Sequence, residues 1–128
     1  MVKEKNDSVI IDKILKCINI ILNVSKDKSI EEIQNNEIIN STIMFQLILI
    51  GEYTTSLSDE YKLKKENIPW NKIKGLRNNI VHDYGGIIYS RLYNTIKNDL
   101  PQLKEELENE IWCCYSCIWK RWTCKFRL

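Results

Sequence analysis

The sequence of 128 residues lacks the features that mark several common classes of protein. No apolar run approaches the ~20 residues needed to cross a bilayer, because Lys13, Lys16 and Asn19 interrupt the most apolar stretch. The first residues are charged and lack the uninterrupted apolar centre of a secretory signal. We therefore expect a cytoplasmic protein that does not enter the membrane and whose cysteines are reduced.

Several catalytic signatures are missing as well. The sequence contains neither the G-x4-G-K-[ST] phosphate loop nor the G-x-G-x-x-G dinucleotide fingerprint. Ser90 and the other serines lack the strand–turn–helix context of a nucleophilic serine. Paired carboxylates occur only in runs such as Glu105-Glu106, which are typical of a solvated helix face. These absences leave few candidates for chemistry.

Only one histidine is present, His82, so proton transfer near neutral pH has a single obvious candidate. Arg77 lies five residues before it, and Tyr84 lies two residues after it. The arginine supplies a permanent, forked cation of the kind that binds phosphate oxygens. The tyrosine supplies a hydroxyl that can donate, accept or be modified.

Helical spacing limits how these side chains can meet. On one continuous helix Arg77 and Tyr84 share nearly one face, and Asn78 lies one turn before His82. Arg77 and His82 diverge by roughly 140°. They converge only if the helix starts or bends nearby, which Gly85-Gly86 would allow, or if a second chain brings them together. Spacing alone favours a structural interpretation, with a buried histidine and a surface arginine.

Residues 77–84, Arg-Asn-Asn-Ile-Val-His-Asp-Tyr, resemble the R-x4-H-x-Y motif of the HepT toxin family in the HEPN superfamily of small helical RNA-acting domains. The resemblance extends over roughly residues 8 to 111. Further matching segments occur in the family's order: Ile50-Gly51-Glu52, Leu57-Ser58, Ile68-Pro69-Trp70, Gly75-Leu76-Arg77 and residues 99–103. The resemblance implies a homodimeric, metal-independent endoribonuclease toxin in which two motifs face one cleft.

The residue types suggest how such a site would work. His82 would take the ribose 2′-OH proton or protonate the 5′-oxygen, and Arg77 would bind the scissile phosphate. Asn78 would orient His82 from one turn away. We expect a 2′,3′-cyclic phosphate product and no metal or other cofactor.

The resemblance also implies a partner. It predicts a minimal nucleotidyltransferase antitoxin that transfers AMP onto Tyr84. The adduct would add bulk and negative charge where an RNA phosphate must bind. Two alternatives stay open: a non-catalytic dimeric module that binds nucleotide or RNA or regulates a nucleotidyltransferase, and a helical interaction domain in which Arg77 and His82 are structural.

The spacing of apolar residues predicts an all-α protein, an up-and-down bundle of four long helices plus short ones. Asp7 or Ser8 would cap the first helix, and Ser29 a short second one. The most apolar helix spans about residues 37–57, and Pro69 opens the helix that carries the motif. The apolar face of the first helix consists of Ile11, Ile14, Leu15, Ile18, Ile21 and Leu22.

The apolar residues of the remaining segments recur less regularly. Residues 62–67 are expected to form a polar loop, and residues 87–97 a helix with Ile88, Leu92 and Ile96 on one face. Asp99 would cap a last helix, whose apolar ladder is Leu100, Leu103, Leu107, Ile111 and Ile118. In the central helix, Gly51 would let another helix approach closely. Glu52 is either a partner for Arg77 or solvated.

The C-terminus differs in composition from the rest. We expect a HEPN-like helical domain over residues 1–111, followed by an extension, residues 112–128, that continues the last helix. The extension has four basic residues and no acidic one, so it carries +4, and residues 1–111 carry −2. Cys114 and Cys117 have a zinc-ligand spacing, but aromatic residues on a continuing helix favour buried or free thiols. Its tryptophans could stack on single-stranded RNA, although packing on the bundle is favoured.

Overall fold

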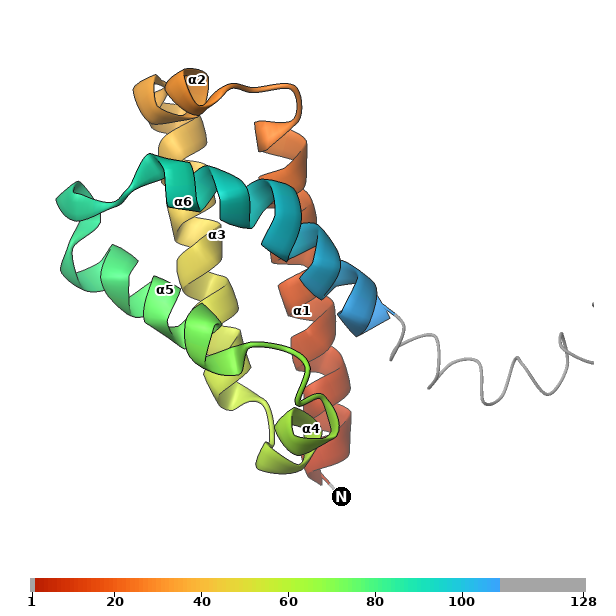
Figure 1. The fold of residues 1–128 in the computed structure, drawn as a ribbon. Helices are drawn as coiled ribbons and strands as arrows, with labels where there is room; N and C mark the ends of the chain where they lie inside the picture. Colours follow the sequence, from red (N-terminus) through yellow and green to blue (C-terminus); the bar gives the residue numbers. More distant parts are fainter. Residues whose placement is uncertain (1, 109–128) are drawn as a thin grey trace, which may run out of the picture.

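A computed structural model of the protein describes residues 2–108, with side-chain burial from residue 7 onward. The described chain consists of helices joined by short turns and contains no strand. Four helices are long (Figure 1): α1 (Val2–Ser25), α3 (Glu37–Ser56), α5 (Trp70–His82), and one that begins as α6 (Tyr89–Asn94), passes through the π-helical turn η2 (Thr95–Asp99) and continues to residue 108. The predicted all-α bundle of four long helices plus short ones is confirmed.

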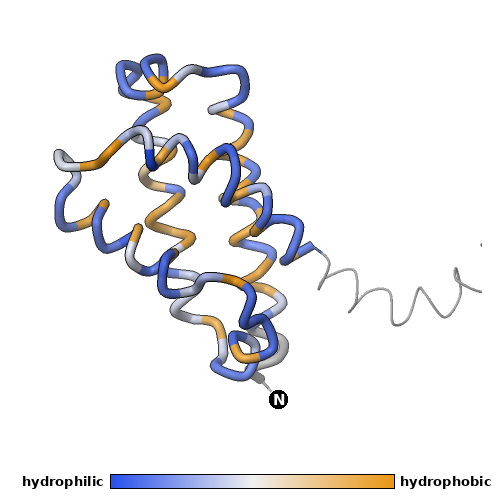
Figure 2. The backbone as a smooth tube through the Cα atoms, viewed as in Figure 1, coloured by the Kyte–Doolittle hydropathy of each residue, from blue (hydrophilic) through white to orange (hydrophobic). Residues whose placement is uncertain are grey.

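The core lies between α1 and α3, which have the most extensive contact of any two helices described. Figure 2 shows that apolar residues dominate α3. The side chains that α1 and α3 bury against each other are mostly isoleucines: Ile11, Ile14, Ile18 and Ile21 from α1, and Ile43, Met44, Leu47 and Ile50 from α3. α5 packs on the other side of α3, so α3 is the central helix, as predicted.

Two helix caps follow each other where α2 (Ile30–Asn35) meets α3. The Ser29 hydroxyl accepts a hydrogen bond from the Glu32 N–H at 3.2 Å, which confirms the predicted cap. Asn36 then caps α3, because its Oδ1 accepts from the N–H groups of Ile38 and Ile39 at 3.1 and 3.2 Å. The start of the central helix is thereby fixed by one side chain.

The predicted cap of the first helix is wrong. α1 already begins at Val2, and Asp7 is a buried residue inside it. The Asp7 carboxylate instead accepts from the Ser58 N–H at 2.9 Å and from the Ser58 hydroxyl at 2.5 Å. The acidic side chain therefore stabilises the turn after α3, 51 residues further on.

The stretch predicted as a polar loop is partly helical. α4 (Asp59–Lys64) covers its first three residues, and Ser58 caps this helix by accepting from the Tyr61 N–H at 3.2 Å. The chain then reaches α5 through Pro69, whose missing N–H costs nothing at a helix start. The indole N–H of Trp70 donates to the Lys65 carbonyl at 3.1 Å and fixes the entry to α5.

The two helices predicted after residue 87 form one continuous helix in the structure. Asp99 caps nothing, because it lies within η2 and the helix runs through it. Ile88 precedes α6 and is 54% exposed, contrary to its predicted place on the apolar face. The apolar ladder is otherwise confirmed for its described members, which are buried: Leu92, Ile96, Leu100, Leu103 and Leu107. Ile111, Ile118 and the whole of residues 112–128 lie outside the described residues.

Within residues 2–108, no helix combines the length and apolar character needed to cross a membrane. The same residues contain no cluster of histidine, cysteine and acidic side chains suited to a metal ion. Cys17 is buried in the core, and burial raises the pKa of its thiol. This cysteine therefore acts as a small apolar residue.

Candidate functional site

Arg77 lies where α5 packs against α3, and Gly51 makes that packing possible. A Cβ built on Gly51 would lie 2.4 Å from the Arg77 Cβ and 2.6 Å from its Cγ. No side chain fits there, so glycine allows the backbone of α3 to lie against the arginine stem. The predicted close approach of a second helix at Gly51 is confirmed.

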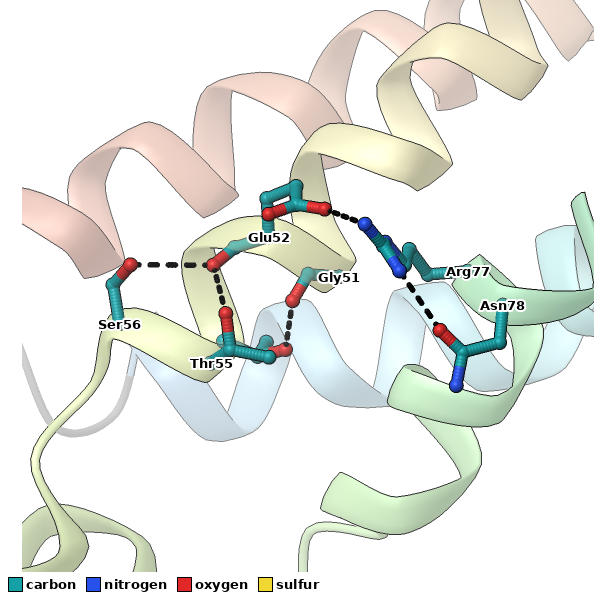
Figure 3. A network of polar contacts seen from close by, with 7 residues as sticks. Gly51, Glu52, Thr55, Ser56, Arg77 and Asn78 are labelled. Atoms are coloured by element: carbon teal, nitrogen blue, oxygen red, sulfur yellow. Dashed lines mark hydrogen bonds and ion pairs between the residues drawn. The ribbon is translucent and has the colours of Figure 1, made fainter. Parts of the chain in front are cut away.

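The guanidinium of Arg77 is oriented by two side chains (Figure 3). Its Nη2 forms an ion pair with the Glu52 carboxylate, and its Nη1 donates to the Asn78 Oδ1 at 2.9 Å. Glu52 is therefore the partner of Arg77, which settles the two alternatives left by the sequence. The Arg77 side chain keeps 30% exposure and Glu52 keeps 48%, so the pair is half-solvated and contributes little to stability. Its main effect is to fix the direction of the cation.

His82 is the last residue of α5 and is exposed to solvent. Within the part of the chain that the structure describes, its side chain has no hydrogen-bond partner. The interpretation with a buried histidine is therefore wrong, whereas the surface arginine is correct in part, because the Arg77 side chain keeps 30% exposure. Asn78 offers its amide oxygen to Arg77, and no bond between Asn78 and His82 occurs among residues 2–108.

Arg77 and His82 do not converge within one chain. α5 runs as an uninterrupted helix from Trp70 to His82, without a kink or a helix start between the two residues. At 3.6 residues per turn their side chains stay roughly 140° apart. A single chain thus presents a fixed cation and a free imidazole in different directions.

Tyr84 lies beyond the end of the motif helix. It is the first residue of the 3-10 turn η1 (Tyr84–Gly86), so the expected common helix face with Arg77 is wrong. Its ring is 50% exposed, and its hydroxyl donates to the Asn40 Oδ1 on α3 at 3.1 Å. Asn40 is 5% exposed and was missed by the sequence analysis. The signal available was the single asparagine among the mostly apolar residues of the central helix.

Large apolar side chains are exposed on α3 and on α5. Ile38 and Phe45 are 80% and 57% exposed on α3, and they lie seven residues apart in line with Glu52. We call these three residues the exposed α3 face, because a seven-residue step returns to nearly the same side of a helix. Val81 on α5 is 46% exposed. Exposed apolar side chains that lie in one row on a helix are candidates for an interface.

An open groove of about 870 Å³ lies elsewhere, between α5 and the last long helix. Leu47, Ile50 and Leu76 contribute apolar lining, and Lys72 and Arg91 contribute charge. Neither Arg77 nor His82 lines it. Asn79 is the motif residue that lines the groove, and the arginine, histidine and tyrosine of the motif lie outside it.

A four-helix bundle that carries R-x4-H-x-Y at the end of one helix defines a HEPN-like domain. The chain belongs to the HepT-like family: the family model described as "Ribonuclease HepT-like" matches residues 14–110. This confirms the family that the motif indicated.

Similar proteins carry matching names. Two proteins of Methanocaldococcus jannaschii, each named a "Putative RNase", are 35% and 32% identical over 95 and 98 residues. These matches cover 74% and 77% of this chain, and 87% and 84% of the relatives. A protein of Thermococcus cleftensis named "Probable ribonuclease HepT" is 24% identical over 98 residues, 77% of this chain and 89% of its own. No solved structure shows significant similarity to the chain.

Proposed function

We propose that the protein is the toxin of a HEPN/MNT toxin–antitoxin pair and acts as a metal-independent endoribonuclease. The observation that carries the proposal is that one helix of a HepT-like chain presents both an oriented guanidinium and a free imidazole. A structural histidine would be buried and hydrogen-bonded, whereas His82 is exposed. RNA is the substrate that the names of the relatives suggest.

The cleavage step uses only groups of the protein and the RNA. His82 takes the proton of the ribose 2′-OH, and the 2′-oxygen attacks the adjacent phosphorus. The bond from phosphorus to the 5′-oxygen breaks, and that oxygen receives a proton. The products are a 2′,3′-cyclic phosphate and a 5′-hydroxyl. Arg77 binds the phosphate oxygens, on which negative charge grows in the transition state.

A homodimer would complete this site. Arg77 and His82 point in different directions on α5, so one chain cannot present both to the same phosphate. A second copy packed against the exposed α3 face would cover Ile38 and Phe45 and bring two motifs to one cleft. One imidazole could then accept the 2′-OH proton while the other protonates the leaving oxygen. The exposed apolar side chains support this arrangement.

Tyr84 is the proposed target of the antitoxin, a minimal nucleotidyltransferase. Its phenolic oxygen attacks the α-phosphorus of ATP, the bond to pyrophosphate breaks, and the phenolic proton is released. The tyrosine then carries AMP, whose negative charge would repel an RNA phosphate at the neighbouring motif. The half-exposed ring of Tyr84 supports its role as the residue that receives AMP.

The direct test is cleavage of RNA by the purified protein, with and without EDTA. We expect cleavage that EDTA leaves unchanged and fragments that end in a 2′,3′-cyclic phosphate. The His82→Ala variant should be inactive, and Lys74→Ala, which removes an exposed cation from the same helix, should stay active. Inhibition by EDTA that one divalent ion reverses would overturn the metal-independent mechanism. Binding of RNA or nucleotide without cleavage would favour the non-catalytic module.

A further inference from the structure

Asn40 is one of the few polar residues buried in the described core, and its amide contacts two tyrosines. Its Oδ1 accepts from the Tyr84 hydroxyl at 3.1 Å. Its Nδ2 donates to the Tyr89 hydroxyl at 2.6 Å and to the Gln34 carbonyl at 3.4 Å. One buried side chain of α3 thus links the turn after α5 to the start of α6.

The Gln34 carbonyl fixes which end of the amide faces which tyrosine. A carbonyl can only accept a hydrogen bond, so the NH₂ group of Asn40 must face it. The amide oxygen is then left for Tyr84, which acts as a donor. Tyr89 receives an N–H and acts as an acceptor. The two phenols are therefore bound to the same residue in opposite senses.

This difference matters for a reaction in which a phenolic oxygen is the nucleophile. Such an oxygen attacks through a lone pair. In Tyr89 the short bond from Asn40 occupies a lone pair of a half-buried hydroxyl. In Tyr84 only the proton is bound, and the oxygen of this half-exposed ring keeps its lone pairs. We infer that Asn40 is a specificity-determining residue that directs nucleotidyl transfer to Tyr84 and protects Tyr89.

The inference rests on the proposed modification of Tyr84 and adds the residue that selects it. The step is the one given above: an oxygen–phosphorus bond forms, pyrophosphate leaves, and the phenolic proton is lost. Since a neutral amide oxygen is too weak a base to take this proton, it must pass to a base of the antitoxin or to water. Asn40 acts by leaving the oxygen of one tyrosine available and occupying that of the other.

A chemical probe tests the selection without the antitoxin. N-acetylimidazole transfers its acetyl group to accessible phenolic oxygens with loss of imidazole, and peptide mass spectrometry locates each adduct. Tyr93 serves as an internal reference, because it lies on the same helix as Tyr89 and its hydroxyl donates to the Lys28 carbonyl at 3.2 Å. In Asn40→Leu the labelling of Tyr89 relative to Tyr93 should rise about fivefold, the effect of one net hydrogen bond.

Two further variants separate this role from a loss of packing. Asn40→Asp keeps an acceptor for Tyr84 but cannot donate to Tyr89, so the ratio of Tyr89 to Tyr93 should rise while labelling of Tyr84 stays at the wild-type rate. Thr42→Val is the matched control, because the Thr42 hydroxyl bonds only the Ile38 carbonyl of its own helix. It should leave every ratio unchanged. General loosening of α6 would expose Tyr89 and Tyr93 together, leave their ratio unchanged and overturn the inference.

The same variants are then incubated with the antitoxin, ATP and magnesium. We expect AMP on Tyr84 alone in the wild type, and on both Tyr84 and Tyr89 in Asn40→Leu. AMP that stays confined to Tyr84 in Asn40→Leu would overturn the role of Asn40 and leave the proposed modification intact. A wild-type protein that acquires no AMP would overturn the proposed modification itself.

Discussion

Arg77 and Tyr84 both contact α3, but through different interactions. Arg77 contacts α3 at Gly51 and Glu52 through close backbone packing and a half-solvated ion pair. Tyr84 contacts the same helix at Asn40, roughly 18 Å earlier along its axis, through a buried amide. The first contact fixes the direction of a charge. The second fixes the hydrogen-bonding state of a hydroxyl. The contacts can therefore be broken separately.

The largest expected effect comes from removing the reacting groups. His82→Ala should lower the rate of RNA cleavage by about 10²-fold or more, since it removes the general base or acid. Arg77→Lys keeps the charge but loses the forked geometry, so we also expect a large loss of activity. The free energy of unfolding of His82→Ala should stay within about 0.5 kcal/mol of wild type, because the residue is exposed. Cleavage that persists in both variants would refute the assignment.

The surface between the two contacts on α3 is tested by Phe45→Glu. If the exposed α3 face is the dimer interface, a charge there should convert the dimer to monomers and abolish cleavage. Multi-angle light scattering at micromolar concentration measures the change. Leu63→Glu is the control, because Leu63 is 67% exposed on α4, outside this face. A wild-type monomer that cleaves RNA would contradict the shared cleft.

The packing at the Arg77 contact is tested by Gly51→Ala. The added methyl group would lie 2.4 Å from the Arg77 Cβ, so the helices must separate. We expect the free energy of unfolding to fall by roughly 1–3 kcal/mol. Gly75→Ala on α5 is the matched control, since a Cβ there meets nothing within 4 Å, and it should stabilise the protein by roughly 0.5–1 kcal/mol. Thermal unfolding of both variants gives the comparison.

The Tyr84 contact is tested by Tyr84→Phe. Loss of the hydroxyl removes the bond to Asn40, so the free energy of unfolding should fall by about 1 kcal/mol. Arg77 and His82 are untouched, and cleavage should therefore continue. Co-expression with the antitoxin should no longer protect cells from this variant. Protection that persists would show that inhibition needs binding only, and AMP found on Tyr93 would place the acceptor elsewhere.

The smallest expected effect is that of Glu52→Gln. The variant keeps an acceptor for Arg77 and removes only the opposite charge of a half-exposed pair. The free energy of unfolding should fall by less than about 1 kcal/mol, and the difference should shrink as salt is added. Denaturation at low and high ionic strength measures this. A large loss that salt does not change would mean that the pair acts as a buried one.

Elements with long apolar periods were predictable from the sequence, whereas contacts across the fold were not. The faces of α1 and α3 follow from residues three and four apart, and Ser29 and Pro69 mark helix starts by local chemistry. The cap at Asp7 failed because a distant turn competes for its carboxylate. The predicted helix boundary at Asp99 is wrong because a helix can accommodate an extra residue as a π-turn.

The candidate site shows the same division. Local sequence indicated Arg77, His82 and Tyr84 as candidates, which stay predictions, and the glycine at position 51 correctly indicated a close approach. It could not show that Asn78 turns toward Arg77, since an amide can bond either neighbour. It also could not identify Asn40, because its two tyrosines lie 44 and 49 residues away along the chain.

The π-turn η2 determines where the last long helix can lose a residue. The N–H of Leu100 donates to the carbonyl of Thr95, so this turn holds one residue more than an α-helical turn. Deleting a single residue such as Asn98 should convert this turn to regular α-helix and leave the residues after it on nearly the same face. Leu103 and Leu107 would then stay in the core, whereas the same deletion in a regular α-helical stretch would rotate them by about 100°. Homologues that lack this turn should therefore have one residue fewer between the apolar residues on its two sides.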